Sequence, residues 1–179
     1  MKNADKAAKA DFNSPSSPVE RDFQIRIDQE GRWYHEGGLI KRIELVKLFA
    51  NVLSVDENGQ HWLRTPAEFG KIEVEDAPFI ITALASAGER QERIIMASDN
   101  LGRDHTIGLD ARLFFKTQAA RSAILADGCP YLRLPAGLVA KLSRPVWYEL
   151  VNLADGENDK GLPGLWSSGI FFALQPQDS

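Results

Sequence analysis

Three acidic side chains near the middle of the chain are its best candidates for catalysis. Glu73 and Glu75 alternate along an expected strand, so their carboxylates lie on one face, and Asp76 follows directly. Two carboxylates that converge raise the pKa of one of them and can act as an acid/base pair. The simpler interpretation, which we favour, is a solvated strand face with Asp76 capping a turn that contains Pro78.

A second group of residues combines aromatic rings with arginine and is suited to binding. Trp33, Tyr34 and His35 are consecutive, and Trp62 stands two residues before Arg64. On a strand, Trp33 and His35 share one face while Tyr34 takes the other. Trp and Arg are common anchors of interfaces, but they also fill cores and form ion pairs. Because one face must belong to the core, only part of this group is expected to meet a ligand.

Other chemistries lack their residue patterns. The histidines His35, His61 and His105 are not spaced as HxH or HxxxH, so no metal site is expected. The sequence has no GxSxG turn for a serine nucleophile and no glycine-rich phosphate loop. Cys129, the single cysteine, lies between a Gly and a Pro and is expected to be a packed side chain. No catalytic residue, cofactor or metal is therefore predicted.

Composition limits the partners of the protein. The net charge is −4 and the isoelectric point is near 5.4. This balance disfavours nucleic acid, because binding to it depends on neutralising phosphates with Lys and Arg. No segment approaches the roughly 18–20 apolar residues that span a bilayer, and the N-terminus lacks the apolar region of a secretory signal. The expected compartment is the cytoplasm, with no membrane partner.

The elements that must position these residues follow from the hydrophobic pattern. Residues 1–20 are rich in Lys, Ala, Asp, Ser and Pro, which predicts a flexible tail. Apolar residues at three- and four-residue spacing predict a helix over 40–53. Thr65 and Glu68 fit a capping box and predict a short helix that ends at Gly70. Alternating or continuous apolar residues predict strands at 23–27, 32–35, 61–64, 72–75 and 79–84.

Motifs of the first half return in the second half in the same order. Three pairs of segments match: 28–32 with 99–103, 62–67 with 131–136, and 78–81 with 145–148. A helix at about 111–125 is the expected counterpart of the helix over 40–53. The sequence therefore predicts an α+β fold of two similar mixed modules, residues 21–88 and 89–179, behind the tail. Their junction is a natural place for a cleft.

Several of these segments together resemble a known family. The segments are 31–37, Arg42 with 45–49, 62–66, and 74–79. In combination they are similar to the uncharacterised bacterial proteins of domain-of-unknown-function family 1285. The resemblance implies a two-module α+β fold with repeated units and a link to signal transduction. It implies no catalytic residues.

These observations favour a non-enzymatic binding or regulatory module of the bacterial cytoplasm. Its partner is an unidentified small molecule or protein, and its site is expected at the module junction or on a surface formed by Trp33, His35 and Arg64. Two alternatives stay open: an acid/base hydrolase that uses the acidic cluster, and a homo-oligomeric structural protein that assembles through edge strands. The candidate ligand-binding residues are Trp33, Tyr34, His35, Arg42, Arg64, Glu75 and Asp76.

Overall fold

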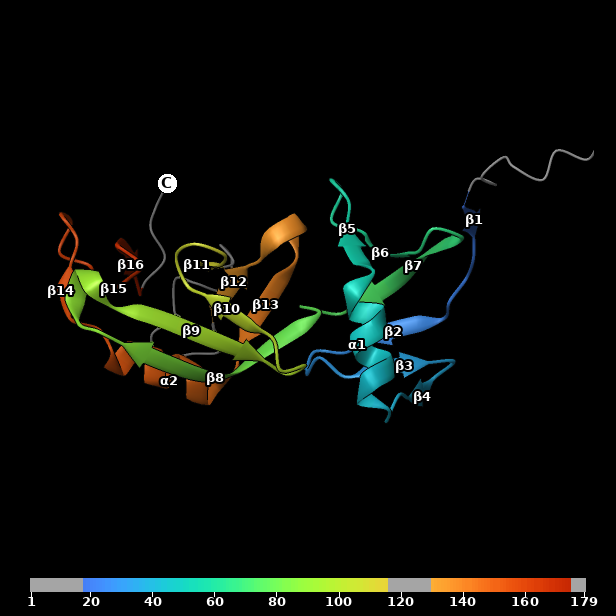
Figure 1. Cartoon of the computed structure of the whole chain (residues 1–179), viewed down its shortest axis with the longest axis horizontal. Helices are drawn as coiled ribbons and strands as arrows, with labels where there is room; N and C mark the ends of the chain where they lie inside the picture. Colours follow the sequence, from blue (N-terminus) through green and yellow to red (C-terminus); the bar gives the residue numbers. More distant parts are fainter. Residues whose placement is uncertain (1–17, 116–129, 175–179) are drawn as a thin grey trace, which may run out of the picture.

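The computed structural model describes residues 18–115 and 130–174, which form two modules arranged along the long axis of the molecule (Figure 1). The predicted two-module organisation is confirmed, and the described residues form mostly strands with two α-helices, which is consistent with the predicted α+β class. The first module contains β1 (Val19–Glu20), β2 (Ile25–Ile27), β3 (Trp33–His35), β4 (Gly38–Leu39), α1 (Ile43–Asn51), β5 (Leu53–Val55), β6 (His61–Arg64) and β7 (Glu68–Val74). The second contains β8 (Phe79–Ala87), η1 (Arg90–Glu92), β9 (Ile94–Asp99), β10 (Asp104–Thr106), β11 (Arg112–Phe114), β12 (Tyr131–Arg133), η3 (Pro135–Gly137), β13 (Val139–Leu142), α2 (Arg144–Asn152), β14 (Gly156–Glu157), β15 (Pro163–Ser167) and β16 (Ile170–Ala173).

The first sheet has the strand order β4-β3-β2-β7-β6-β5, and β1 pairs with β7. The central β2–β7 pair is parallel, whereas β2–β3 and β6–β7 are antiparallel. Ile25 and Ile27 are buried while Arg26 between them is half-buried, which is the alternation expected of a strand with one face on the core. Helix α1 covers the core face through Val46 and Ala50.

The second sheet has the strand order β10-β9-β8-β13-β12-β11, the order of the first sheet with every number raised by six. Its central β8–β13 pair is again parallel. A small third sheet, β14-β15-β16, lies at the far end of this module (Figure 1). The buried Ser167 ties it to the second sheet, since its hydroxyl donates to the carbonyl of Ile107 at 2.6 Å and accepts from the amide of Ile95 at 3.0 Å.

The chain passes from the first sheet to the second between β7 and β8. β7 ends at Val74 and β8 begins at Phe79, so residues 75–78 form the connection. The module boundary predicted from the sequence, 88/89, falls just after β8, which ends at Ala87. In the structure β8 pairs with β9 and β13 and therefore lies in the second sheet.

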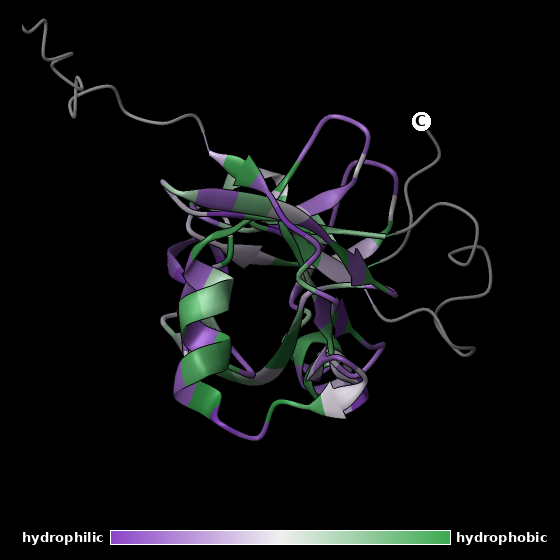
Figure 2. Cartoon of the chain, turned by 90° about the vertical axis from the view of Figure 1, so that its right-hand side faces the viewer, coloured by the Kyte–Doolittle hydropathy of each residue, from purple (hydrophilic) through white to green (hydrophobic). Residues whose placement is uncertain are grey.

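One hydrophobic cluster runs through both modules and includes Ile27 and Trp33 from the first and Ile81 and Leu132 from the second. Figure 2 shows α1 banded with hydrophobic and hydrophilic residues, as an amphipathic helix requires. Among the described residues, neither helix has the length and apolar character needed to cross a bilayer.

The short helix predicted after Thr65 is wrong. The Thr65 hydroxyl accepts from the amide of Glu68 at 3.0 Å and donates to its carbonyl at 2.9 Å, which closes a turn between β6 and β7. The Glu68 carboxylate pairs with Arg21 at 3.0 Å and does not reach back to Thr65 as a capping box requires. The same residue pattern therefore starts a strand.

The last two residues of the predicted tail, 19 and 20, form a strand. Val19 and Glu20 form β1, which pairs in parallel with Glu68 and Phe69. Residues 1–17 lie outside the described residues, as does Cys129.

The matched segments behind the predicted repeat have different outcomes. Residues 28–32 and 99–103 form the same kind of turn, but the first joins β2 to β3 and the second joins β9 to β10. The match of 78–81 with 145–148 pairs a strand with α2. Of the helix expected at 111–125, residues 112–114 form β11, and 116–125 lie outside the described part. The repetition of whole modules stays a prediction.

We expect that Gly70 on β7 is needed for the close packing of β1 and of the segment after it against β7. A Cβ at this position would overlap the carbonyl oxygen of Arg21 and lie 2.8 Å from the ring of Phe23. Gly70→Ala should therefore lower the free energy of unfolding by about 1–3 kcal/mol through overpacking. Gly38→Ala is the matched control, because its Cβ meets only the carbonyl oxygen of His35 at 3.5 Å. Urea unfolding of both variants checks this, and equal stabilities would contradict it.

Candidate ligand-binding site

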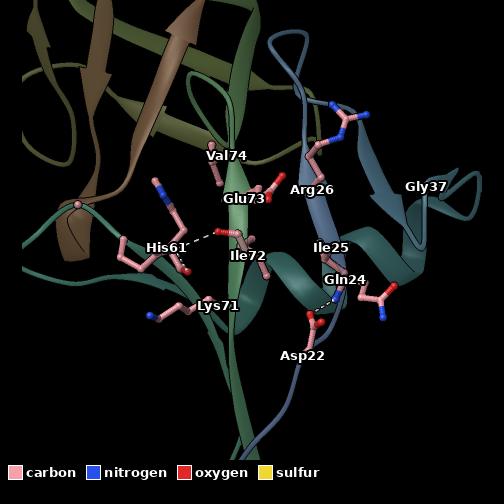
Figure 3. A pocket seen from close by; sticks show the side chains of 12 residues that line it. Asp22, Gln24, Ile25, Arg26, Gly37, His61, Lys71, Ile72, Glu73 and Val74 are labelled. Carbon is pink, nitrogen blue, oxygen red and sulfur yellow. Dashed lines mark hydrogen bonds between the residues drawn. The ribbon is translucent and has the colours of Figure 1, made fainter.

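A pocket lies in the first module where the N-terminal segment and β7 separate. β1 pairs with β7 at Glu68–Phe69 and β2 pairs with it at Glu73–Val74. Between these two contacts the chain over 21–24 belongs to no strand. The pocket has a volume of about 770 Å³, within the range of small-molecule sites. Its lining residues are Asp22, Gln24, Ile25, Arg26, Gly37, Gly59, Gln60, His61, Lys71, Ile72, Glu73 and Val74 (Figure 3).

Two acidic and two basic side chains line this pocket. Asp22 and Glu73 carry negative charge, and Arg26 and Lys71 carry positive charge. Arg26 is held in place, because its guanidinium forms an ion pair with Glu75. One Asp22 oxygen accepts from the amide of Gln24 at 3.0 Å (Figure 3). The formal charges of the lining balance, so the pocket suits a polar ligand that offers complementary charges or hydrogen-bonding groups.

One wall of the pocket is fixed by hydrogen bonds to the backbone. The Gln60 amide donates to the carbonyls of His61 at 2.9 Å and Ile72 at 3.1 Å, which joins the start of β6 to β7. Burial lowers the pKa of His61, against a smaller opposing effect of Asp56, so the imidazole is neutral at pH 7. This wall presents neutral polar groups in a preset geometry.

Lys71 also belongs to a cluster of cations and rings on the outer face of the first sheet, which we call the Trp62 cluster: Trp62, Arg64, Phe69 and Lys71. Arg64 lies 5.0 Å from the Trp62 ring centre and 5.6 Å from that of Phe69. The Lys71 ammonium lies 5.3 Å from the Trp62 ring centre. The Trp62 indole donates to Asp56 at 2.9 Å, so the orientation of the ring is fixed. The cluster places two cations beside an immobilised aromatic surface.

Three hairpin turns share one set of contacts. In each, an aspartate accepts from the amides two and four residues later and contacts a ring six residues later. The aspartate–ring pairs are Asp28 with Tyr34 at 3.0 Å, Asp56 with Trp62 at 2.9 Å, and Asp99 with His105 at 3.1 Å. A glycine with positive φ occupies the position three after each aspartate, as such tight turns require. The first two turns fix rings that contact the pocket residues Arg26 and Lys71, whereas the third lies in the second module.

Polar contacts cross the junction between the modules. Asp76 accepts from the Tyr131 hydroxyl at 2.9 and 3.1 Å and from the Lys141 ammonium at 2.7 Å. The Asn100 side chain accepts from the amide of Ile80 at 3.1 Å and donates to the carbonyl of Gly31 at 3.2 Å. These bonds join the connection and both modules, whereas the pocket above lies within the first module.

Comparisons with known proteins agree with this two-module architecture. The family model described as the N-terminal domain of DUF1285, a domain of unknown function, matches residues 14–77. The model of the C-terminal domain of DUF1285 proteins, described as of unknown function, matches residues 78–174. The chain belongs to the DUF1285 family. The resemblance found in the sequence is therefore confirmed.

Two solved structures of DUF1285 proteins are similar to this chain. A DUF1285 family protein from Silicibacter pomeroyi DSS-3, solved at 2.50 Å, shares 30% identity with a TM-score of 0.77, and the match covers 89% of this chain and 84% of that one. A DUF1285 family protein from Shewanella baltica OS155, solved at 1.40 Å, shares 28% identity with a TM-score of 0.58, and the match covers 74% of this chain and 93% of that one. No match is found among curated proteins.

The predicted aromatic and basic site residues of this DUF1285 chain do not form one surface. Trp33 is 1% exposed and stacks on Phe49 of α1, so it lies in the core. His35 is exposed at the end of β3. Arg64 lies on the other face of the sheet, in the Trp62 cluster. The predicted surface of Trp33, His35 and Arg64 is therefore divided between core and solvent.

The remaining predicted residues also separate. Tyr34 lies under the Arg26 guanidinium at 4.4 Å. Arg42 is exposed at the residue preceding α1, where it makes no side-chain cap. Glu75 pairs with Arg26, and Asp76 lies at the module junction. Of these residues, Tyr34 and Glu75 contact the pocket lining, both through Arg26.

The sequence analysis missed most of the pocket. Lys71, Asp22 and Gln60 were not singled out, because strand alternation shows which face they occupy but not that the sheet opens beside them. One signal was available: Trp62 follows Asp56 by six residues, the spacing that Tyr34 has from Asp28.

Within residues 18–115 and 130–174, no three His, Cys, Asp or Glu side chains are grouped so that they could hold a metal ion.

Proposed function

We propose that this DUF1285 chain is a binding module that takes a small polar ligand in the pocket lined by β2, β7 and the turn before β6. The observation that carries the proposal is the pocket itself: about 770 Å³, lined by opposite charges and by a wall fixed through Gln60. Such a pocket can select a ligand by placed polar groups without any reactive constellation.

The acid/base hydrolase is the weaker candidate. Among the three carboxylates it needs, Glu73 lines the pocket, Glu75 pairs with Arg26, and Asp76 pairs with Lys141 of the second module. Their separate partners give them no common target, whereas an acid/base pair must approach one substrate bond. We therefore do not propose a hydrolase.

The proposal extends to regulation in the bacterial cytoplasm, the role that the family resemblance favours. The connection over 75–78 starts directly after β7, and Asp76 within it binds Tyr131 and Lys141. A ligand that moves the end of β7 would shift this contact and so change the second module. The same proposal treats the modules as structural repeats, since their two sheets share one strand order.

A thermal-shift screen against nucleotides, second messengers and metabolites tests the binding function. A ligand at about 100 times its Kd stabilises the native state by about 2.7 kcal/mol, which raises the midpoint by roughly 5–10 °C for a chain of this length. Gln24→Trp fills the pocket and should abolish the shift. Gln29→Trp is the matched control, because Gln29 is also exposed but lies outside the lining.

The outcomes of the screen separate clearly. A shift that is lost in Gln24→Trp and kept in Gln29→Trp supports the pocket as the site. A shift that survives in both variants, or a screen without any stabilising compound, contradicts the proposed function.

A further inference from the structure

A carboxylate is already bound in the second sheet by an aromatic–lysine pair. Tyr131 of β12 and Lys141 of β13 are direct cross-strand partners. The Tyr131 hydroxyl and the Lys141 ammonium both bind the Asp76 carboxylate, the latter at 2.7 Å. The pair of strands β12 and β13 therefore shows how an aromatic residue and a lysine on neighbouring strands bind a carboxylate.

The first sheet presents an aromatic–lysine pair at the corresponding strands. Trp62 of β6 and Lys71 of β7 are direct cross-strand partners. In the first sheet, β7 lies between its parallel partner β2 and β6. In the second sheet, β13 lies between its parallel partner β8 and β12. Arginine follows two residues after each aromatic, at Arg64 and Arg133.

The two pairs differ in what their lysine binds. Lys141 holds Asp76, whereas Lys71 has no carboxylate oxygen within 4.0 Å among the described residues. Its ammonium instead lies near the Trp62 ring, and the residue lines the pocket. The Trp62 indole cannot take the place of the Tyr131 hydroxyl, because it already donates to Asp56. Lys71 is therefore the group of this pair that is left to receive an anion.

We infer that the ligand of the pocket carries a carboxylate, and that the Lys71 ammonium binds it beside the face of Trp62. The inference rests on the proposed function and names the chemical class of its ligand. An ammonium–carboxylate hydrogen bond is shorter and stronger than a neutral one. Arg64, 5.0 Å from the centre of the same ring, adds positive potential beside it. The ligand class is a small carboxylic acid in its ionised form.

NMR titration of the full chain tests this with matched acids and amides. The probes are succinate and glutarate against succinamide and glutaramide, and the readout is the Trp62 indole N–H signal, assigned with Trp62→Phe. We expect a saturable shift with the acids and none with the amides. Lys71→Gln should weaken acid binding about fivefold or more, while Lys71→Arg retains it. Glu73→Gln, which removes a negative charge from the same pocket, should bind the acids as well or more tightly.

Two results overturn the inference: equal shifts with acids and amides, or acid shifts that are unchanged in Lys71→Gln. The proposed function fails separately. A neutral compound that stabilises the protein and is excluded by Gln24→Trp leaves the pocket function standing and refutes the carboxylate. A protein that no compound stabilises and whose Trp62 signal no acid shifts refutes both.

Discussion

Asp99→Ala is expected to lower the free energy of unfolding by about 3–5 kcal/mol. The Asp99 carboxylate is 2% exposed and accepts from the amides of Leu101 and Arg103 at 2.9 and 3.0 Å. It also binds the Arg103 Nε at 2.8 Å and contacts His105. Without it, the Arg103 charge stays over the Phe79 ring, 3.9 Å from its centre, with no carboxylate to compensate it. Urea unfolding at pH 7 measures the loss.

Asp28→Ala is the matched control for this prediction. Asp28 makes the same turn contacts with Arg32 and Tyr34. The Arg32 side chain is 56% exposed, however, against 33% for Arg103, so water compensates its charge better after the carboxylate is removed. We expect a clearly smaller loss than for Asp99→Ala. Equal losses would show that burial of the arginine does not set the cost.

The same carboxylate makes stability depend on pH. Burial acts to raise the pKa of Asp99, but the contacts with His105 and the Arg103 backbone and side chain outweigh it and lower the pKa to about 2, from an ordinary 3.8. The folded chain therefore holds fewer protons than the unfolded chain in this range. The lowered pKa of Asp99 contributes about 2 kcal/mol to the free energy of unfolding. This contribution is fully present above pH 4 and is lost as the pH falls toward 2. The stability difference between the wild type and Asp99→Ala should shrink by most of this amount between pH 5 and pH 2.5, and a constant difference would contradict the assignment.

Trp33→Ala is expected to cost about 3–5 kcal/mol of unfolding free energy. The Trp33 ring is buried and stacks on Phe49 with ring centres 6.3 Å apart, so truncation leaves a cavity between the first sheet and α1. Trp33→Phe keeps a ring in this space and should cost less. His35→Ala, on the same strand but exposed, should stay within about 0.5 kcal/mol of the wild type. Chemical denaturation of the three variants measures the series.

Trp33 was predicted to meet a ligand, and this series distinguishes that role from the core. If Trp33 is a core residue, Trp33→Phe lowers stability while ligand-induced stabilisation in the screen stays as large as in the wild type. A variant with unchanged stability and lost ligand response would restore Trp33 to the binding site.

Local patterns in the sequence predicted the elements whose causes are local. Helix α1 follows from the spacing of Val46 and Ala50 with their apolar neighbours. The turns at Asp28 and Asp56 have a local cause too, since each combines an aspartate with a glycine three residues later. The mistake at Thr65 has a local cause as well, because a hydroxyl that accepts from the amide three residues later serves a hairpin as well as a helix start.

The pocket could not be predicted, because it depends on pairings between distant segments. Gly70 lets the segment with Arg21 and Phe23 approach β7 closely, and residues of this segment and of β7 line the pocket. The partner of Asp76 was equally hidden, since Lys141 lies 65 residues later in the chain. Sequence spacing identifies a strand face, whereas a site requires knowing which strands become neighbours.

The most direct test of the account is a map of backbone amide shifts for the compound that most stabilises the protein in the thermal screen. We expect the largest shifts at 22–26, at 59–61 and at 71–74, the segments that line the pocket, with a saturable dependence on concentration. Largest shifts on α1, on the second sheet or at the Asp76 junction, with the pocket amides unmoved, would contradict the claim that this pocket is the binding site.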